Sequence, residues 1–399
     1  QLHICGLKKS LATGVSRVRP NGCEPDSSRC RTTPSCQRSV AVVIGASCNC
    51  SGEAYSKVSA MLLHALRACS RITSAAVIHL EEAIVAPAEM LPYLGRGRHD
   101  GKEGNLAYHN SLMVQFWSAL ATRDTRLMAH VLGTHFPDRL TNATYATYIR
   151  CHDDIGWAIT DEDAVAVGAS GHGHRNFLSD FYEGSFPGTF AMGALFQENP
   201  ATGDKRISGS YASLAGLERA LSAGDAAGVD LAVQRMLLGH ALIAAYGGIP
   251  LIYMGDELAL PNDRGYLDTP EHAHDSRWIH RPRMDWSLVE ARQSGDTPSA
   301  RVFAGTRQIL ARRAATPALH AGVPVRVVAS GNAAVFSFQR LAPTGTLLGL
   351  FNFTEHWQNV PETWARAQGV TALHDALSDS AVGTHVGQIV LPPYSRVWL

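Results

Sequence analysis

Two apolar runs with the composition of β-strands each end in acidic side chains. One run covers residues 75–80 and the other covers residues 145–149. The side chains that follow them are Glu81 and Glu82 after the first run, and His152, Asp153 and Asp154 after the second. Parallel α/β barrels place their chemistry at the C-terminal ends of strands, so these acids are expected at one rim. Such acids predict chemistry on glycosidic bonds, because one must protonate a leaving oxygen while others face a developing positive charge.

The overall composition favours a neutral substrate over a charged polymer. The chain has 399 residues, of which 45% are apolar, enough for two or three domains with a packed core. Its 35 basic residues balance 35 acidic ones, so no net field attracts nucleic acid or an anionic membrane. The first residues lack the charged and apolar pattern of a secretory signal. By default we expect a cytoplasmic protein with no nucleic-acid or membrane partner.

The most apolar long segment, residues 237–254, is predicted to be a buried helix followed by a buried strand. Gly239, the glycine pair at 247–248 and Pro250 interrupt its apolar character. A membrane span needs roughly twenty uninterrupted apolar residues, so these interruptions argue against one.

The first fifty residues differ from the rest of the chain. They hold six of the eight cysteines, are rich in Arg and Ser, and lack regular periodicity. We interpret residues 1–50 as an irregular leader that is not native to the fold, and translation in a shifted reading frame would explain it. The cysteines show no paired C-x-x-C spacing, and the histidine pairs at 172 and 174 and at 272 and 274 have no further ligands nearby. We expect no metal and no cofactor.

Regular periodicity begins near Ser59. Helices are predicted at residues 59–71, 105–120, 125–132, 230–246 and 300–313, and a third strand is predicted at residues 249–254. The segment from Gly156 to Gly216 has little periodicity, which predicts a long ordered insertion of the kind that usually serves function. Beyond residue 317, short alternating runs separated by Gly and Pro predict strands.

The order of these elements predicts an α/β fold. Residues 51–316 are expected to form the C-terminal half of a TIM (β/α)8 barrel with a loop domain inserted at about residues 156–216. Residues 317–399 are expected to form an all-β sandwich domain. The signals account for about four β/α units, whereas a closed barrel needs eight.

Residues 59–399 resemble the C-terminal part of an amylosucrase, in the α-amylase superfamily (glycoside hydrolase family 13). The segments that carry the resemblance, in chain order, are residues 82–85, 150–157, 199–206, 251–257 and 275–283. The resemblance implies a retaining double displacement on sucrose, in which a glucosyl unit passes from the enzyme to an α-glucan or to water. Such a mechanism uses two carboxyl groups roughly 5 Å apart.

The resemblance also implies roles for individual residues. Glu82 matches the acid/base, whose pKa would be raised by an apolar environment, and Glu81 competes with it if the register slips by one. Asp153 matches the carboxylate that stabilises the oxocarbenium-like transition state. The implied substrate-binding residues are His152 for sugar hydroxyls, Asp154 and Arg206 on the fructose or acceptor side, and Arg277 at the bottom of the pocket. Asp256 and Glu257 are interpreted as structural.

The chain departs from this family at the nucleophile. The family carries it in an Arg-x-Asp-Ala-Val strand about forty residues before the acid/base, and the corresponding residues 38–42 have Val40 where the aspartate belongs. Valine cannot attack an anomeric carbon. The alternative to an amylosucrase-like enzyme is therefore a truncated, catalytically inactive remnant. A sucrose hydrolase or a trehalose-forming enzyme of the same superfamily is a third possibility.

Overall fold

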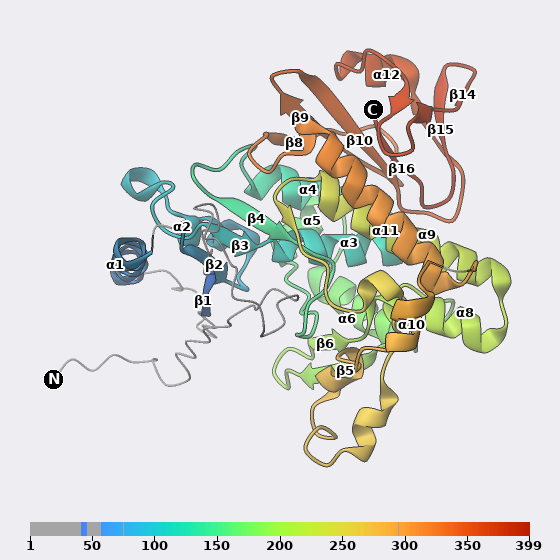
Figure 1. Ribbon diagram of the computed structural model, residues 1–399, viewed down its shortest axis with the longest axis horizontal. Coiled ribbons are helices and arrows are strands. Elements are labelled where there is room, and N and C mark those ends of the chain that lie inside the picture. The colour runs from blue at the N-terminus through green and yellow to red at the C-terminus, as the bar shows by residue number, and fades with distance from the viewer. Residues whose placement is uncertain (1–40, 46–56, 75, 294) are drawn as a thin grey trace, which may run out of the picture. The chain divides into compact units, whose positions relative to one another are not determined.

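The computed structural model describes residues 41–45, 57–74, 76–293 and 295–399, and they fall into two compact units (Figure 1). The first unit comprises residues up to Val85, together with Glu89–Tyr108 and Thr141–Ala143. The second comprises Ala86–Ala88, His109–Leu140 and Thr144–Leu399. Each unit is described by itself.

The first unit is built on three parallel strands in the order β1-β2-β3. Its elements are β1 (Ala41–Gly45), α1 (Lys57–Thr73), β2 (Ile78–Glu82), most of α2 (Pro87–Leu94), η1 (Gly97–His99) and β3 (Leu106–Tyr108). Parallel neighbours need a crossover connection, and α1 provides it between β1 and β2. The helix and strand predicted around residues 59–80 are thus confirmed. The leader prediction does not extend to residues 41–45, which form β1, and residues 1–40 and 46–50 lie outside the described residues.

The helix predicted at residues 105–120 is wrong at its start. Leu106–Tyr108 form β3, in which Leu106 lies opposite Leu80 of β2. The helix α3 begins at Asn110, and His109 caps it by accepting a hydrogen bond from the backbone N–H of Leu112 through Nδ1. A three-residue strand is too short to show a period of two in the sequence, so its residues do not stand out from the helical pattern that follows.

The second unit combines barrel-type elements with the C-terminal domain. Its parallel strand pair is β4 (Thr144–Thr147) and β7 (Ile249–Pro250). Its longer helices are α3 (Asn110–Thr122), α4 (Arg126–His135), α8 (Leu217–Ala223), α9 (Ala226–Ala245), α10 (Trp286–Ala291) and α11 (Pro298–Ala315). The predictions of α4, α9 and α11 are confirmed. The strand predicted at residues 249–254 is shorter, because the chain leaves the ladder after Pro250 and forms the 3-10 turn η2 (Asp256–Leu258).

The insertion at residues 156–216 is more regular than predicted. It contains α5 (Asp161–Ala166), α6 (Gly171–Glu183), the hairpin strands β5 (Ala194–Glu198) and β6 (Lys205–Ser208), and α7 (Tyr211–Leu214). Thr160, Ser170 and Ser210 each cap a helix with a side-chain oxygen. These helices have four to thirteen residues, and the shortest are below the length at which helical periodicity can be recognised.

The C-terminal domain is mainly β-structure, as predicted. One sheet has the order β16-β10-β9-β8, a second has β11-β15-β14, and β12 pairs with β13. The strands are β8 (Val325–Val327), β9 (Val335–Ala342), β10 (Gly345–Asn352), β11 (Gln358–Pro361), β12 (His374–Asp375), β13 (Ser380–Ala381), β14 (Thr384–His385), β15 (Gln388–Leu391) and β16 (Arg396–Trp398). Buried aliphatic side chains from the two larger sheets form one core with the short helix α12 (Glu362–Ala367), which was not predicted.

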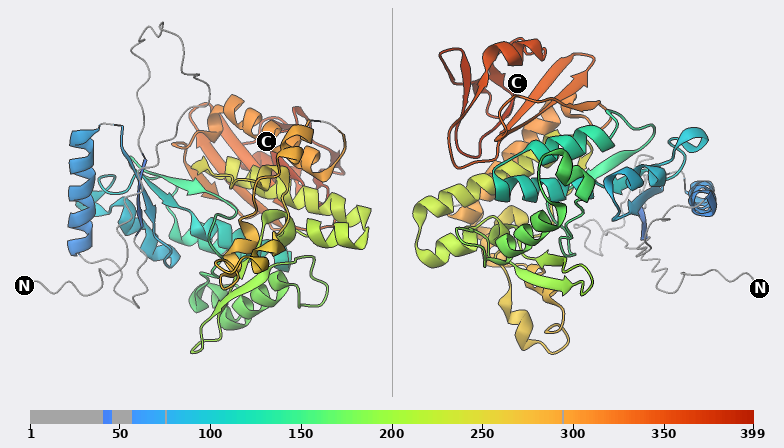
Figure 2. Two further views of the ribbon diagram at one scale, coloured as in Figure 1. Left: turned by 60° about the horizontal axis from the view of Figure 1, so that its bottom comes forward. Right: turned by 180° about the vertical axis from the view of Figure 1, so that it is seen from behind.

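The C-terminal domain packs on the helices of the same unit (Figure 2). The fully buried Arg340 of β9 donates hydrogen bonds to the carbonyl oxygens of Ala245, His320 and Val323. Arg123, after α3, forms a 2.6 Å ion pair with Glu355. These contacts join the barrel-type helices and the C-terminal sheets into one compact unit, although the sequence predicted a domain boundary near residue 316.

Among the helices that the structure describes, one, α9, has the length and the apolar composition that a membrane span needs. Within the protein, 61% of its most apolar window is buried. From Ala232 to Ala245 every residue except Gln234 is buried, which is the pattern of a core helix.

Candidate functional site

Asp153 lies in the loop after β4, within reach of three basic side chains. Its Oδ1 is 3.2 Å from Nη1 of Arg277 and 3.5 Å from Nη2 of Arg281. Its Oδ2 is 3.5 Å from Nε2 of His152. The carboxylate retains 35% exposure, so it is both electrostatically supported and accessible. This is an arrangement that can stabilise positive charge developing on a bound substrate.

A buried ion pair supports the end of β4. Arg150 and Asp256 are almost fully buried, and the guanidinium of Arg150 lies 2.8 Å from Oδ1 of Asp256. Arg150 also donates to the carbonyl oxygen of His280 and lies over the ring of Tyr253, 4.5 Å from its centroid. Burial raises the pKa of Asp256 to about 6, although Arg150 opposes the shift. Asp256 therefore has a structural environment, in agreement with its interpretation from the sequence.

The carbonyl oxygen of His152 is held by two donors. Nε2 of His280 lies 2.9 Å from it and Nε of Arg281 lies 2.7 Å from it. Nδ1 of His280 accepts a hydrogen bond from the backbone N–H of Gly209, so Nε2 carries the proton in the neutral ring. Burial and the nearby Arg150 lower the pKa of His280 to about 3. The neutral His280 thus fixes the backbone from which His152 and Asp153 extend.

Arg277 connects Asp153 to the loop that follows η2. Its Nη2 lies 2.8 Å from Oδ2 of Asp275, and its Nε donates to Oδ1 of the same carboxylate. These hydrogen bonds lower the pKa of Asp275 to about 2. The guanidinium also lies 4.8 Å from the ring centroid of Phe196 on β5. Arg277, which the resemblance places at the bottom of the pocket, thus pairs with both Asp275 and Asp153.

Asp154 faces a different cation. Its Oδ2 lies 3.2 Å from Nη1 of Arg206 on β6, and its side chain is 7% exposed. Burial raises the pKa of Asp154 while Arg206 opposes the rise. A bridge between Ile155 and Ile207 joins the loop to the β5-β6 hairpin and holds this pair in place. The structure thus joins in an ion pair the two residues that the resemblance implies for the fructose or acceptor side.

The two glutamates at the end of β2 have different environments. Glu81 is 1% exposed, and burial followed by the neighbouring Glu103 raises its pKa to about 8, while Arg67 opposes the rise. Glu82 is partly exposed. Adjacent strand residues point to opposite faces, so Glu82 cannot share the buried environment of Glu81. The raised pKa that the resemblance implies for the acid/base is therefore found at Glu81, whereas Glu82 has the more accessible position.

The strand beside β2 carries no acid. In β1, Gly45 lies opposite Glu82, and the five residues of β1 are Ala, Val, Val, Ile and Gly. Val40, which stands where the resemblance puts the nucleophile, lies outside the described residues. Of the two strands that pair with β2, β1 thus contributes no carboxylate within its described residues 41–45.

The structure brings most of the predicted site residues together within the second unit. His152, Asp153 and Arg277 form one cluster, and Asp154 and Arg206 form an adjoining pair. Glu82 belongs to the first unit. Sequence reasoning assigned no role to Arg150, His280 or Arg281, although each lies in a segment that carries the resemblance. The density of Arg and His in residues 275–283 was the available signal.

No group of three or more metal-binding side chains occurs among the described residues.

Comparisons with known proteins agree with this architecture. Residues 325–399 match the family model described as amylosucrase, C-terminal domain. The α-amylase from H. orenii superposes with a TM-score of 0.50 at 11% identity, covering 86% of this chain and 56% of its own. Sucrose 6F-phosphate phosphorylase from Thermoanaerobacter thermosaccharolyticum gives a TM-score of 0.51 at 15% identity, covering 75% of this chain and 52% of its own.

A third solved structure, of AmyP bound to maltotriose, has a TM-score of 0.51 at 14% identity and covers 85% of this chain and 61% of its own. The chain spans between 52% and 61% of the lengths of the three proteins. By its fold the chain is similar to these three solved structures, and by residues 325–399 it is similar to the C-terminal domain of amylosucrase.

Proposed function

We propose that the chain derives from an amylosucrase-like enzyme that transfers glucosyl units from sucrose to an α-glucan with retention. The observation that carries the proposal is the placement of Asp153 after β4, accessible and facing Arg277 and Arg281. The match of residues 325–399 to the amylosucrase C-terminal domain favours sucrose and α-glucan as substrates over other sugars.

In the proposed reaction, each side chain has a separate task. Glu82 donates a proton to the oxygen that leaves with fructose and later accepts a proton from the incoming hydroxyl. Asp153 stabilises the positive charge that develops on the glucosyl ring. His152 binds a sugar hydroxyl beside it, and the Asp154–Arg206 pair contacts the fructose or acceptor side.

The covalent step requires a carboxylate that the described residues of β1 do not supply. This observation favours a second candidate function, in which the chain is an inactive remnant that binds sugars without sustained turnover. The two candidates differ in one measurement, which is fructose release from sucrose by the purified chain. Sustained fructose release would refute the proposal that the chain is an inactive remnant. If no fructose is released, the enzymatic proposal holds only for the ancestor of the chain.

A rescue experiment distinguishes a chain that lacks only the nucleophile from a chain that lacks the whole active site. α-Glucosyl fluoride is incubated with the chain, with and without azide. If only the nucleophile is absent, azide displaces fluoride from the anomeric carbon, and β-glucosyl azide and fluoride ion appear together. Asp153→Asn should abolish this azide-dependent release. Release that is equal in the chain and in the variant would contradict the proposed site.

Product analysis tests the remaining alternatives in any preparation that turns over. Glucose and fructose in equal amounts would indicate a sucrose hydrolase, and trehalose would indicate a trehalose-forming enzyme. A growing α-glucan would support the amylosucrase-like reaction.

A further inference from the structure

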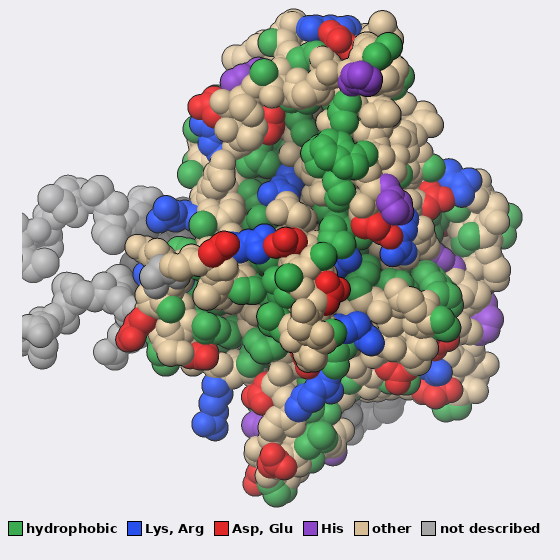
Figure 3. Space-filling view, turned by 90° about the vertical axis from the view of Figure 1, so that its right-hand side faces the viewer, with side chains coloured by type: hydrophobic (Ala, Val, Ile, Leu, Met, Phe, Trp, Pro, Cys, Tyr) green, Lys and Arg blue, Asp and Glu red, His purple; other side chains and the backbone are tan. Residues whose placement is uncertain are grey.

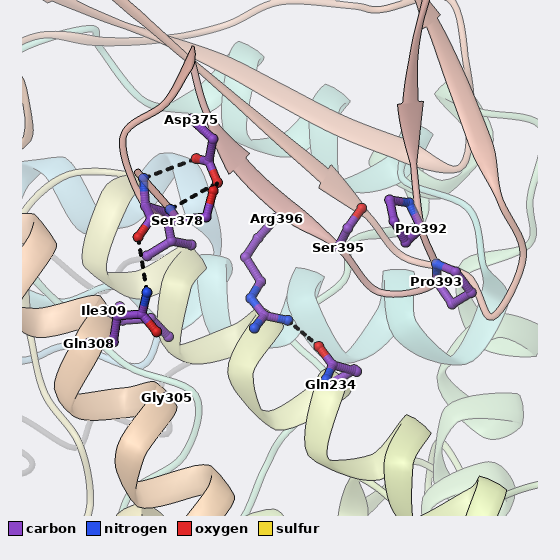
Figure 4. Close-up of a pocket in the computed structure, with 11 residues that line it drawn as sticks. Gln234, Gly305, Gln308, Ile309, Asp375, Ser378, Pro392, Pro393, Ser395 and Arg396 are labelled. Carbon is purple, nitrogen blue, oxygen red and sulfur yellow. Dashed lines mark hydrogen bonds between the residues drawn. The ribbon is translucent and has the colours of Figure 1, made fainter. Parts of the chain in front are cut away.

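A cavity of about 490 Å³ lies between the C-terminal domain and helices α9 and α11, and its polar groups pair with one another (Figure 4). Nη1 of Arg396 donates to Oε1 of Gln234, and the charge of Asp375 acts on Arg396. Nε2 of Gln308 donates to the carbonyl oxygen of Leu377. Hydrophobic side chains gather on the surface along the same junction (Figure 3). These contacts hold the C-terminal domain on the two helices.

The 3-10 helix η4 (Ser276–His280) lies in the segment that borders the candidate site. The side chain of Asp275 caps its N-terminus by accepting a hydrogen bond from the backbone N–H of Arg277. Oγ of Ser276 donates to the carbonyl oxygen of Leu195 on β5 at a distance of 3.1 Å. The helix is therefore fixed to the β5-β6 hairpin, and the side chains that it directs at the site have a firm base.

Arg281, which follows η4, contacts both the backbone and the carboxylate of the loop after β4. Its Nε donates to the carbonyl oxygen of His152 at 2.7 Å, and its Nη2 lies 3.5 Å from Oδ1 of Asp153. His280 shares the carbonyl oxygen, and Arg277 shares the carboxylate oxygen. Arg281 thus combines in one planar group the two contacts that His280 and Arg277 make separately.

Trp278 of η4 supports the guanidinium of Arg281. The centre of the guanidinium lies 5.3 Å from the centroid of the indole ring, which is within the range of a cation–π interaction. The indole in turn stacks on the ring of His272, with centroids 3.5 Å apart and planes 12° from parallel. The side chain of Arg281 is 19% exposed, so most of it lies within these contacts. The ring, the carbonyl oxygen and the carboxylate together determine where the guanidinium lies.

We propose that Arg281 is a positioning residue for Asp153 and that Trp278 holds its guanidinium in place. The inference rests on the proposed function, in which Asp153 faces the positive charge that develops on the glucosyl ring. A carboxylate stabilises such a charge only from a defined place, and a misplacement of about 1 Å can cost about a hundredfold in rate. Arg281 restrains both the backbone at His152 and the orientation of the carboxylate, so Asp153 is in place before the substrate binds.

A positioning role and a purely electrostatic role predict opposite results for a cationic ligand. The positive charge of Arg281 repels a cation bound beside Asp153, so the removal of this charge alone would strengthen binding. The loss of positioning weakens binding instead, because the carboxylate no longer faces the cation. 1-Deoxynojirimycin is a suitable probe, since it has the shape of glucose and a protonated ring nitrogen at neutral pH. Its binding involves no covalent step and therefore needs no nucleophile.

The test titrates the whole chain with 1-deoxynojirimycin by isothermal calorimetry at constant ionic strength. We expect Arg281→Gln and Arg281→Lys to weaken binding by about tenfold each. Lysine keeps the charge, but a single ammonium group cannot hold the carbonyl oxygen and the carboxylate together as the planar guanidinium does. Trp278→Leu should weaken binding by about threefold, because the guanidinium keeps its other two contacts. The matched controls Arg283→Gln and Trp286→Leu, at exposed positions, should bind as the unaltered chain does.

Chemical rescue guards against a folding defect in the variants. Guanidinium ion at millimolar concentration should restore binding to Arg281→Ala, because it can make the same contacts with the ring, the carbonyl oxygen and the carboxylate. Methylammonium at the same concentration should restore less, since it carries the charge without the planar set of donors. Far-UV circular dichroism verifies the fold of each variant.

The outcomes distinguish this inference from the proposed function. The inference is overturned if folded Arg281→Gln or Arg281→Lys binds the probe as tightly as the unaltered chain, or more tightly, while Asp153→Asn binds it weakly. It is also overturned if guanidinium and methylammonium act alike on Arg281→Ala. The proposed function would stand after either result. If the unaltered chain does not bind the probe at millimolar concentration, or if Asp153→Asn binds it with unchanged affinity, the proposed site is wrong and the inference is overturned with it.

Discussion

Nη1 of Arg277 lies 3.2 Å from Oδ1 of Asp153, although 124 residues separate them in the chain. The same guanidinium binds Asp275, so Arg277 is held from one side while it faces Asp153 from the other. Asp153 therefore has a fixed electrostatic partner before any substrate arrives. Preorganised charge of this kind lowers a barrier because it needs no reorganisation during the reaction.

We expect Arg277→Gln and Asp153→Asn to suppress azide-dependent fluoride release from α-glucosyl fluoride. The loss for Asp153→Asn should reach about a hundredfold or more, since it removes the charge that faces the transition state. Arg277→Gln should have a smaller effect, because Arg281 remains near the carboxylate. Arg326→Gln, which removes an exposed ion pair with Asp138, serves as the control. Equal rates in Asp153→Asn and in the control would contradict the assignment.

The buried pair of Arg150 and Asp256 should be a strong determinant of stability. Arg150→Met is expected to lower the free energy of unfolding by about 3–5 kcal/mol, because it leaves a buried carboxylate without its partner. The double variant Arg150→Met with Asp256→Leu should recover a large part of this loss. Arg126→Met, which removes the exposed pair with Asp124, should cost at most about 1 kcal/mol. Urea unfolding compares the unaltered chain with these three variants. Equal losses of unfolding free energy in Arg150→Met and Arg126→Met would show that the buried pair is dispensable.

Glu81 should make stability depend on pH in the neutral range. Its folded pKa of about 8 exceeds the ordinary value of 4.5, so the folded state binds the additional proton. The stability it contributes is fully present below pH 4.5 and is lost as the pH rises through 8. Glu81→Gln should remove this loss, whereas Glu82→Gln, at the partly exposed neighbour, should retain it. Urea unfolding between pH 5 and pH 9 measures the slope, and identical slopes in Glu81→Gln and the unaltered chain would refute the prediction.

His280 should contribute to destabilisation in acid. Its folded pKa of about 3 lies below the ordinary value of 6.5, so the unfolded state takes up a proton first. Stability is therefore lost as the pH falls from 6.5 toward 3. The buried His109 and His240, whose pKa values are lowered to about 3 and about 4, act in the same direction. His280→Gln, which keeps a donor and an acceptor, should reduce the proton uptake on unfolding at pH 5 by about one proton. An unchanged uptake would contradict a neutral His280.

The sequence by itself determined those features whose signal is local. A long apolar helix at residues 230–246, the strand before Asp153 and the short strands beyond residue 317 all have a periodicity that a short window reveals. β3 was missed because Leu106–Tyr108 become a strand through pairing with β2, and three residues show no period of their own. The same applies to the short elements of the insertion, which tertiary contacts stabilise.

The tertiary structure gave Glu81 and Glu82 different environments. Both are glutamates at the end of one strand, and only the burial of Glu81 near Glu103 and Arg67 distinguishes them. Likewise, the tertiary structure gave Arg277 its two carboxylate partners, Asp153 and Asp275. Hydrophobic periodicity is encoded by near neighbours in sequence, whereas the pairing of a charge depends on which distant segments the fold brings within a few ångströms.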